Sequence, residues 1–147
     1  PIELSQDDVF FNCTEGRFKL RILSENWGEL IFYRRADQQG PSESTYFISP
    51  TDSPGTLFKV LSEACGCVEW VRKKRILYHV GRSRIHLDQV EALGSFLEIE
   101  TVLSEEETVA TGMREMSDLL DVLGIQTTDL IAGSYLDLKN QKGRHHV

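Results

Sequence analysis

Alternating apolar and polar residues run through most of the chain and predict a protein built mainly of β-strands. The clearest case is 17–23, where Phe18, Leu20 and Ile22 share one face and charged side chains share the other. A turn at 24–28 and a second alternating segment at 29–35 complete a predicted hairpin. Further strands are predicted at 45–49, in a long segment from Val71, through Asp88 after a turn at 80–83, and at 96–103.

Two segments have helical periodicity instead. The first follows Asp52 or Ser53, either of which can cap it, and its predicted apolar stripe is Leu57, Val60, Leu61 and Ala64. The second follows a predicted capping box at 104–107, with Ser104 at the cap and Glu107 three residues later, and runs to about Leu123. The predicted class is therefore α+β, mainly antiparallel strands with separate helices, in one domain at 1–139 followed by a polar tail at 140–147.

Composition narrows the function classes. The 147 residues carry a net charge of −7, which argues against non-specific binding of nucleic acid. No apolar run approaches the roughly 20 residues of a membrane helix, so no membrane association is predicted. Cys13, Cys65 and Cys67 have no spacing typical of a disulfide framework, and we interpret them as reduced thiols of a cytoplasmic protein.

Positive charges gather on particular strand faces. Lys19 and Arg21 are two apart on one predicted strand, Lys73 and Arg75 are two apart on another, and Arg35 lies beside Tyr33 on a third. An antiparallel sheet with one solvated face would explain any one of these pairs. Like charges on neighbouring strands destabilise such a sheet, however, so their accumulation favours faces that point inward toward an anionic ligand.

Acidic residues follow the basic ones. Arg84, His86 and Asp88 share one predicted face, and Glu98 and Glu100 share another. These acids have a surface interpretation as well, but their carboxylates are the hard oxygen ligands that suit Mg²⁺ or Mn²⁺. Carboxylates holding a divalent metal beside Lys and Arg match the chemistry of polyphosphate transfer. Tyr33 and His86 are candidates for proton transfer or for packing.

At these residues the chain resembles the CYTH superfamily, the triphosphate tunnel metalloenzymes, and most of all its branch similar to class IV adenylyl cyclases. The resemblance spans about 8–138 and is densest at 16–21, 29–37, 71–75, 84–88 and 93–100, with a weaker match at 134–136. It implies an eight-stranded antiparallel barrel with helices outside. It also implies a phosphate-binding set, Lys19, Arg21, Arg35, Lys73, Arg75 and Arg84, and metal ligands for Mg²⁺ or Mn²⁺, Asp88, Glu98 and Glu100.

One departure limits the resemblance. The family opens on a strand with the pattern Glu-x-Glu-x-Lys followed by a helix, whereas this chain has Ser5 two residues after Glu3. The barrel is therefore expected to lack its first strand here.

Three hypotheses remain open. The first is a metal-dependent enzyme, a triphosphatase or adenylyl cyclase acting on ATP, inorganic triphosphate or thiamine triphosphate. The second is an inactive module that binds polyphosphate or nucleotide, and the third is a structural sheet domain with a solvated charged face. The resemblance is also compatible with a homodimer.

Overall fold

A single antiparallel sheet organises the protein in the computed structural model, which describes residues 1–35 and 43–130. Within this part of the chain, seven strands follow the order β4-β3-β2-β1-β5-β6-β7. They are β1 (Ile2–Phe11), β2 (Arg17–Ser24), β3 (Trp27–Arg35), β4 (Ser44–Thr51), β5 (Cys67–Val80), β6 (Ser83–Val90) and β7 (Gly94–Thr101). The predicted α+β class and the antiparallel arrangement are confirmed, and the eighth strand of a closed barrel stays a prediction.

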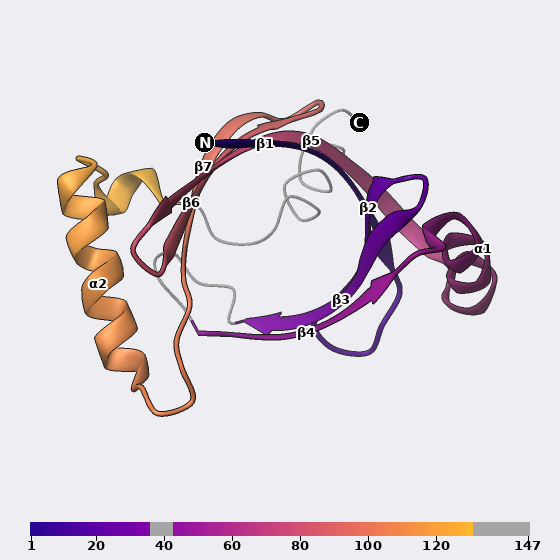
Figure 1. Ribbon diagram of the computed structural model, residues 1–147, viewed down its shortest axis with the longest axis horizontal. Coiled ribbons are helices and arrows are strands. Elements are labelled where there is room, and N and C mark those ends of the chain that lie inside the picture. The colour runs from indigo at the N-terminus through magenta and orange to yellow at the C-terminus, as the bar shows by residue number, and fades with distance from the viewer. Residues whose placement is uncertain (36–42, 131–147) are drawn as a thin grey trace.

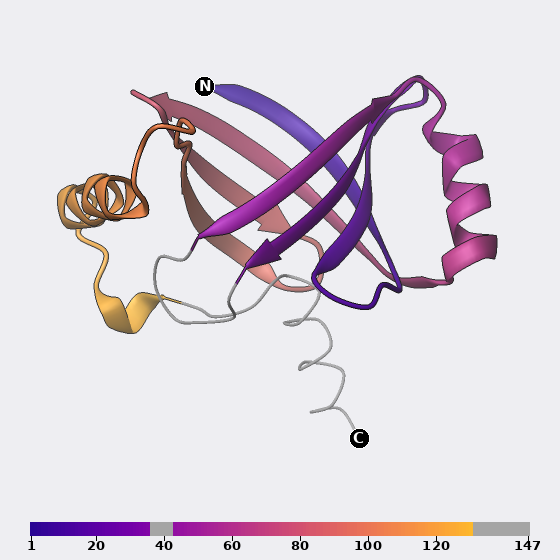
Figure 2. The ribbon, with the colours of Figure 1, turned by 90° about the horizontal axis from the view of Figure 1, so that it is seen from below.

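The sheet curls strongly, so its strands surround a concave face when viewed end-on (Figure 1). The edge strands are β4 and β7, and β1 lies at the centre between β2 and β5. Helix α1 (Pro54–Cys65) follows β4, and helix α2 (Val109–Val122) follows β7. Both helices lie outside the ring of strands, on opposite sides of it (Figures 1 and 2).

The convex face carries the larger apolar cluster. Val9, Phe11 and Leu20 are buried there, and Leu57, Phe58 and Leu61 of α1 pack against them. The apolar stripe predicted for this helix was partly wrong. Val60 is 59% exposed, and Phe58, tilted against the ring of Trp70, packs in its place. Periodicity defines an apolar side of a helix but not which residues at its border contact the sheet, so it did not separate Val60 from Phe58.

A second, smaller apolar cluster lies on the concave face. Phe10, Val71 and Val90 are buried, with Leu93 and Phe96 packed against them. These residues lie where β1 and β6 end and where β5 and β7 begin, so they gather at one end of the concave face. The middle of that face is left to polar and charged side chains.

The start of α2 differs from the predicted capping box. The helix begins at Val109, and its cap is Thr108, whose hydroxyl accepts a hydrogen bond from the backbone N–H of Thr111. The Glu107 carboxylate instead accepts bonds from Ser104 and from Arg82 in the β5–β6 turn. Because Arg82 also binds Glu115 of α2 at 2.7 and 2.8 Å, this ion pair ties the helix to the sheet.

The last described segment is a short 3₁₀ helix at Thr127–Asp129. The remainder of the predicted closing element, including Tyr135, and the predicted tail at 140–147 lie outside the described residues. No helix in 1–35 or 43–130 is both long and apolar enough to cross a membrane.

Candidate functional site

The concave face collects the charged residues predicted to form the site. Val9 and Phe11 of β1 face α1 on the convex side, so alternation turns Asp8 and Phe10 to the concave side. The antiparallel register then brings Arg21 of β2 and Val71 of β5 to either side of Asp8. Extending the alternation across the sheet places on this face Lys19, Arg21, Lys73, Arg75, Arg84, His86, Asp88, Glu98 and Glu100.

Asp8 is the centre of the cationic part of this face. Its side chain is buried, and its carboxylate accepts two hydrogen bonds from Arg21, from Nε and Nη2, each 2.9 Å long. Lys19 Nζ lies 3.2 Å from Asp8 Oδ2, and Lys73 Nζ lies 3.6 Å from the same oxygen. Cations from β2 and β5 therefore converge on a single buried carboxylate from the strand between them. We call these four residues the Asp8 cluster.

Burial and charge act against each other in the Asp8 cluster. Burial alone would raise the pKa of Asp8, but Lys19, Arg21 and Lys73 outweigh it and hold that pKa well below its usual range. Burial lowers the pKa of Lys19, although Asp8 opposes the change. Burial also lowers the pKa of Lys73, to about 7. The cluster thus holds a carboxylate that stays ionised and a lysine that changes charge near neutral pH.

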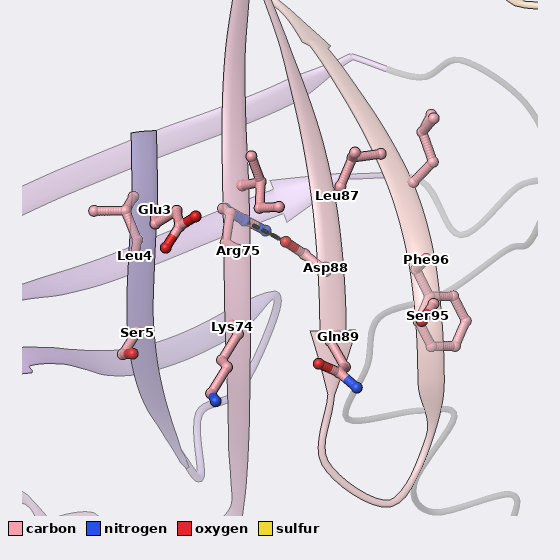
Figure 3. A pocket seen from close by; sticks show the side chains of 12 residues that line it. Glu3, Leu4, Ser5, Lys74, Arg75, Leu87, Asp88, Gln89, Ser95 and Phe96 are labelled. Carbon is pink, nitrogen blue, oxygen red and sulfur yellow. Dashed lines mark hydrogen bonds and ion pairs between the residues drawn. The ribbon is translucent and has the colours of Figure 1, made fainter. Parts of the chain in front are cut away.

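A second ion pair lies between β5 and β6, where Arg75 and Asp88 are register partners. Arg75 donates from Nε and Nη2 to the two Asp88 oxygens, both at 2.6 Å (Figure 3). Its Nη2 also lies 3.6 Å from Glu98 Oε2 on β7. The open pocket beside this pair is also lined by Lys74 and Gln89 of the opposite face, but not by His86 or Glu98. The metal-binding role of Asp88 stays a prediction.

A different trio has the geometry of a metal site. The trio is His86, Glu98 and Glu100. Each residue offers one ligand atom, and these three atoms all lie within 4.8 Å of one another. Ligand atoms about 2.0–2.6 Å from one cation lie at most about 5 Å apart, so the separations fit a divalent ion. His86 Nδ1 is buried, forms no hydrogen bond within the described chain, and lies 3.8 Å from Glu98 Oε1. The donor set and this orphaned nitrogen therefore fit a bound cation.

The charge of Glu98 agrees with that role. Burial would raise the pKa of Glu98, but His86, Arg75 and Lys73 hold it well below its usual range. Glu100 accepts a 2.7 Å bond from Arg84 Nη2, while the buried Nε of Arg84 has no hydrogen-bond partner in the described chain. The trio therefore offers an ionised carboxylate beside polar atoms that a ligand could satisfy.

Two predicted residues of β3 lie further toward the β4 edge. Tyr33 is buried, and the Lys19 ammonium lies 5.2 Å from the centre of its ring. Arg35 lies in β3, with its backbone paired to Ser44 of β4, and its phosphate-binding role stays a prediction.

Sequence reasoning missed Asp8 and Gln6, two buried polar residues of the concave face. Gln6 is the register partner of Lys73, and its Oε1 has no hydrogen-bond partner among the described residues. The available signal was weak, because Asp7 and Asp8 are adjacent and identical in chemistry. Val9, Phe10 and Phe11 are all apolar, so the sequence does not show which of the two aspartates shares the charged face; the packing of Val9 and Phe11 against α1 does.

These observations define a class of protein: a curled antiparallel sheet whose concave face holds buried cations beside a candidate metal site. The CYTH domain matches residues 2–135, and the chain belongs to that family. A protein of Methanocaldococcus jannaschii with the name "Putative adenylate cyclase MJ0240" is 27% identical over 141 residues, covering 91% of this chain and 81% of that protein.

Solved structures share the fold. The PH1012 protein of Pyrococcus horikoshii superimposes with a TM-score of 0.84 and 20% identity, covering 94% of this chain and 84% of the other. A conserved hypothetical protein of Pyrococcus furiosus gives a TM-score of 0.79 with the same identity of 20% and the same coverages of 94% and 84%. At these identities the comparisons establish the architecture alone.

Replacing Asp8 with Asn tests whether one carboxylate balances the buried cations. We expect Asp8→Asn to lower the free energy of unfolding by about 3–5 kcal/mol, because it leaves buried cations without their counter-charge. Urea unfolding followed by circular dichroism measures the change.

Asp7→Asn is the matched control, because the neighbouring Asp7 side chain is 44% exposed and its carboxylate is 3.9 Å from Arg72. Its effect should stay within about 0.5 kcal/mol, as for other solvent-exposed ion pairs. Equal effects of the two substitutions would contradict the proposed balance.

Proposed function

We propose that this protein is a divalent-metal-dependent enzyme that acts on triphosphate compounds by attack at phosphorus. The observation that carries the proposal is the juxtaposition, on one concave face, of buried cations with the His86, Glu98 and Glu100 trio. Membership of the CYTH family and the name of the archaeal relative support the same substrate class.

The cations would hold the phosphate chain. Lys19, Lys73 and Arg21 converge from two strands, and each has N–H donors beyond those directed at Asp8. Charge-assisted hydrogen bonds to phosphate oxygens are among the strongest in proteins. Asp8 would keep these donors in place before the ligand arrives, so that binding requires little rearrangement.

The trio would hold the metal next to the phosphate chain. A divalent cation bound there would polarise a phosphoryl oxygen and offset the charge that develops on the phosphates. Because His86 contributes a nitrogen ligand, the set favours Mn²⁺ over Mg²⁺, which prefers oxygen alone. Arg75 and Arg84 remain predicted phosphate ligands, and their contacts with Glu98 and Glu100 would also orient those carboxylates.

The attacking oxygen decides the product. Water gives hydrolysis, and the 3′-hydroxyl of a nucleotide gives a cyclic nucleotide; both reactions use the same bound phosphates. Tyr33 stays a candidate for proton transfer or for packing, and for His86 the proposal replaces proton transfer with metal binding. A cytoplasmic location is part of the proposal as well.

Product analysis tests the function directly. We expect the chain to release phosphate from inorganic triphosphate, or cyclic AMP and pyrophosphate from ATP, when Mg²⁺ or Mn²⁺ is present. Lys73→Met should weaken inorganic triphosphate binding at pH 6 by about tenfold or more, because it removes a charge-assisted contact.

Lys74→Met is the matched control, because Lys74 is exposed and lies on the opposite face of the same strand. Its affinity should stay within about twofold of the wild type, as for a surface charge. Binding without either product would instead assign the protein to the polyphosphate-binding modules, and no binding would overturn the proposal.

Protonation of Lys73 gives a second test. With its pKa lowered to about 7, the amine is mostly neutral at pH 8 in the free protein. A bound triphosphate adds negative charge nearby and raises that pKa, so binding at pH 8 should take up as much as about one proton.

Calorimetry of triphosphate binding in Tris and in HEPES, which differ in ionisation enthalpy, measures this proton uptake. Lys74→Met should keep the wild-type value, and Lys73→Met should lose most of it. An unchanged uptake in Lys73→Met would show that the proton goes elsewhere.

Metal binding can be measured without turnover. We expect Glu98→Gln and Glu100→Gln each to weaken Mn²⁺ binding by about tenfold or more, because each removes a charged ligand. Electron paramagnetic resonance of free Mn²⁺ during titration measures the affinity. Glu91→Gln, at an exposed loop position, is the control, and an equal loss in all three variants would argue against the trio.

A further inference from the structure

Toward the β4 edge the concave face adds an aromatic pair to its charged residues, which there include Arg17, the register partner of Tyr33. Tyr33 of β3 and Tyr46 of the edge strand β4 are register partners and therefore share this face. Their rings stack, with centroids 5.5 Å apart and planes inclined by 26°. Tyr33 is 6% exposed, whereas Tyr46 is 41% exposed. The pair thus presents a partly exposed ring that rests on a buried one.

The aromatic pair is continuous with the Asp8 cluster. Lys19 Nζ lies 5.2 Å from the Tyr33 ring centre and 3.2 Å from Asp8 Oδ2, so one lysine joins the two groups. A phosphate held by Lys19 would lie beside Tyr33, with Tyr46 one ring further along the sheet. In a nucleoside triphosphate, a sugar separates the phosphates from a flat ring in the same order.

We propose that Tyr33 and Tyr46 form a subsite for the aromatic ring of an organic triphosphate, with Tyr46 as the contacting surface. The inference rests on the proposed function, because the ring is positioned by the phosphates bound at the Asp8 cluster. The subsite would favour a triphosphate that carries a nucleobase, or another flat ring, over inorganic triphosphate.

Stacking is the interaction that this geometry supplies. Aromatic side chains bind bases through their faces without requiring a particular hydrogen-bond pattern. Tyr46 is already held by Tyr33, so a ligand ring would meet an ordered surface and lose little side-chain entropy on binding. Because Lys19 lies between Asp8 and Tyr33, the phosphate contacts and the ring contact would follow one another along the sheet.

The opposite face of the same strands provides an internal comparison. Phe47 stacks on Phe32 at 6.5 Å and 27°, and Phe47 is 63% exposed. This convex-face pair has the exposure but lacks the neighbouring Asp8 cluster. Phe47 is therefore a matched control, adjacent in sequence and similar in chemistry.

Calorimetric titration in EDTA separates the contributions, because turnover is then suppressed and the cationic face binds alone. The ligands are inorganic triphosphate, ribose 5-triphosphate, ATP and thiamine triphosphate. We expect Tyr46→Leu to weaken binding of ATP, of thiamine triphosphate, or of both by about fivefold or more. Binding of the two ligands without an aromatic ring should change less than about twofold. Whichever aromatic ligand loses affinity identifies the source of the ring.

Two control variants complete the test. Tyr46→Phe should keep wild-type affinities because it retains the ring, and Phe47→Leu should keep them because it lies on the other face. The inference is overturned if Tyr46→Leu leaves both aromatic ligands unaffected, or if it weakens inorganic triphosphate equally. If the wild type binds none of the four ligands, the phosphate site itself is wrong and the subsite falls with it. Wild-type binding of inorganic triphosphate with no Tyr46 effect would reject the subsite alone.

Discussion

The carboxylate of Asp8 is the constraint on which the interior depends. Lys19, Arg21 and Lys73 could not occupy a buried sheet face together without an anion, because desolvation and mutual repulsion would oppose folding. Asp8 comes from the central strand, between the two strands that supply the cations, and reaches all three. One buried anion therefore lets the curled sheet hold three cations on its concave face, where the proposed function would direct them toward a bound phosphate.

The alternation of residues predicted the strands and the faces on which most site residues lie. Phe18 and Leu20 identified the helix-covered face of β2, and the intervening Lys19 was correctly expected on the other. Partners were harder to predict, because they depend on which strands are neighbours. β1 joins β2 to β5, which is distant in sequence, and only this pairing brings Lys73 to Asp8. The predicted capping box was wrong for a related reason: the Glu107 carboxylate pairs with Arg82, which comes from a turn distant in sequence.

The two faces of the sheet differ in what they bury. On the convex face, Val9 and Leu20 bury against α1 and supply apolar stabilisation. On the concave face, the apolar cluster around Phe10 is confined to one end. The rest of that face carries ion pairs and buried polar atoms without hydrogen-bond partners, such as His86 Nδ1, where a second apolar core would otherwise form. These polar atoms could form hydrogen bonds with a ligand.

A ligand bound on this concave face, as proposed, would contribute to the stability of the fold. The unfolded chain scatters the Asp8 cluster and cannot bind as the assembled face does, so any occupant of the face stabilises the native state by mass action. The gain grows with the logarithm of ligand concentration above its dissociation constant. If the proposed triphosphate occupies this face, the lifetime of the folded protein would rise with the concentration of that ligand.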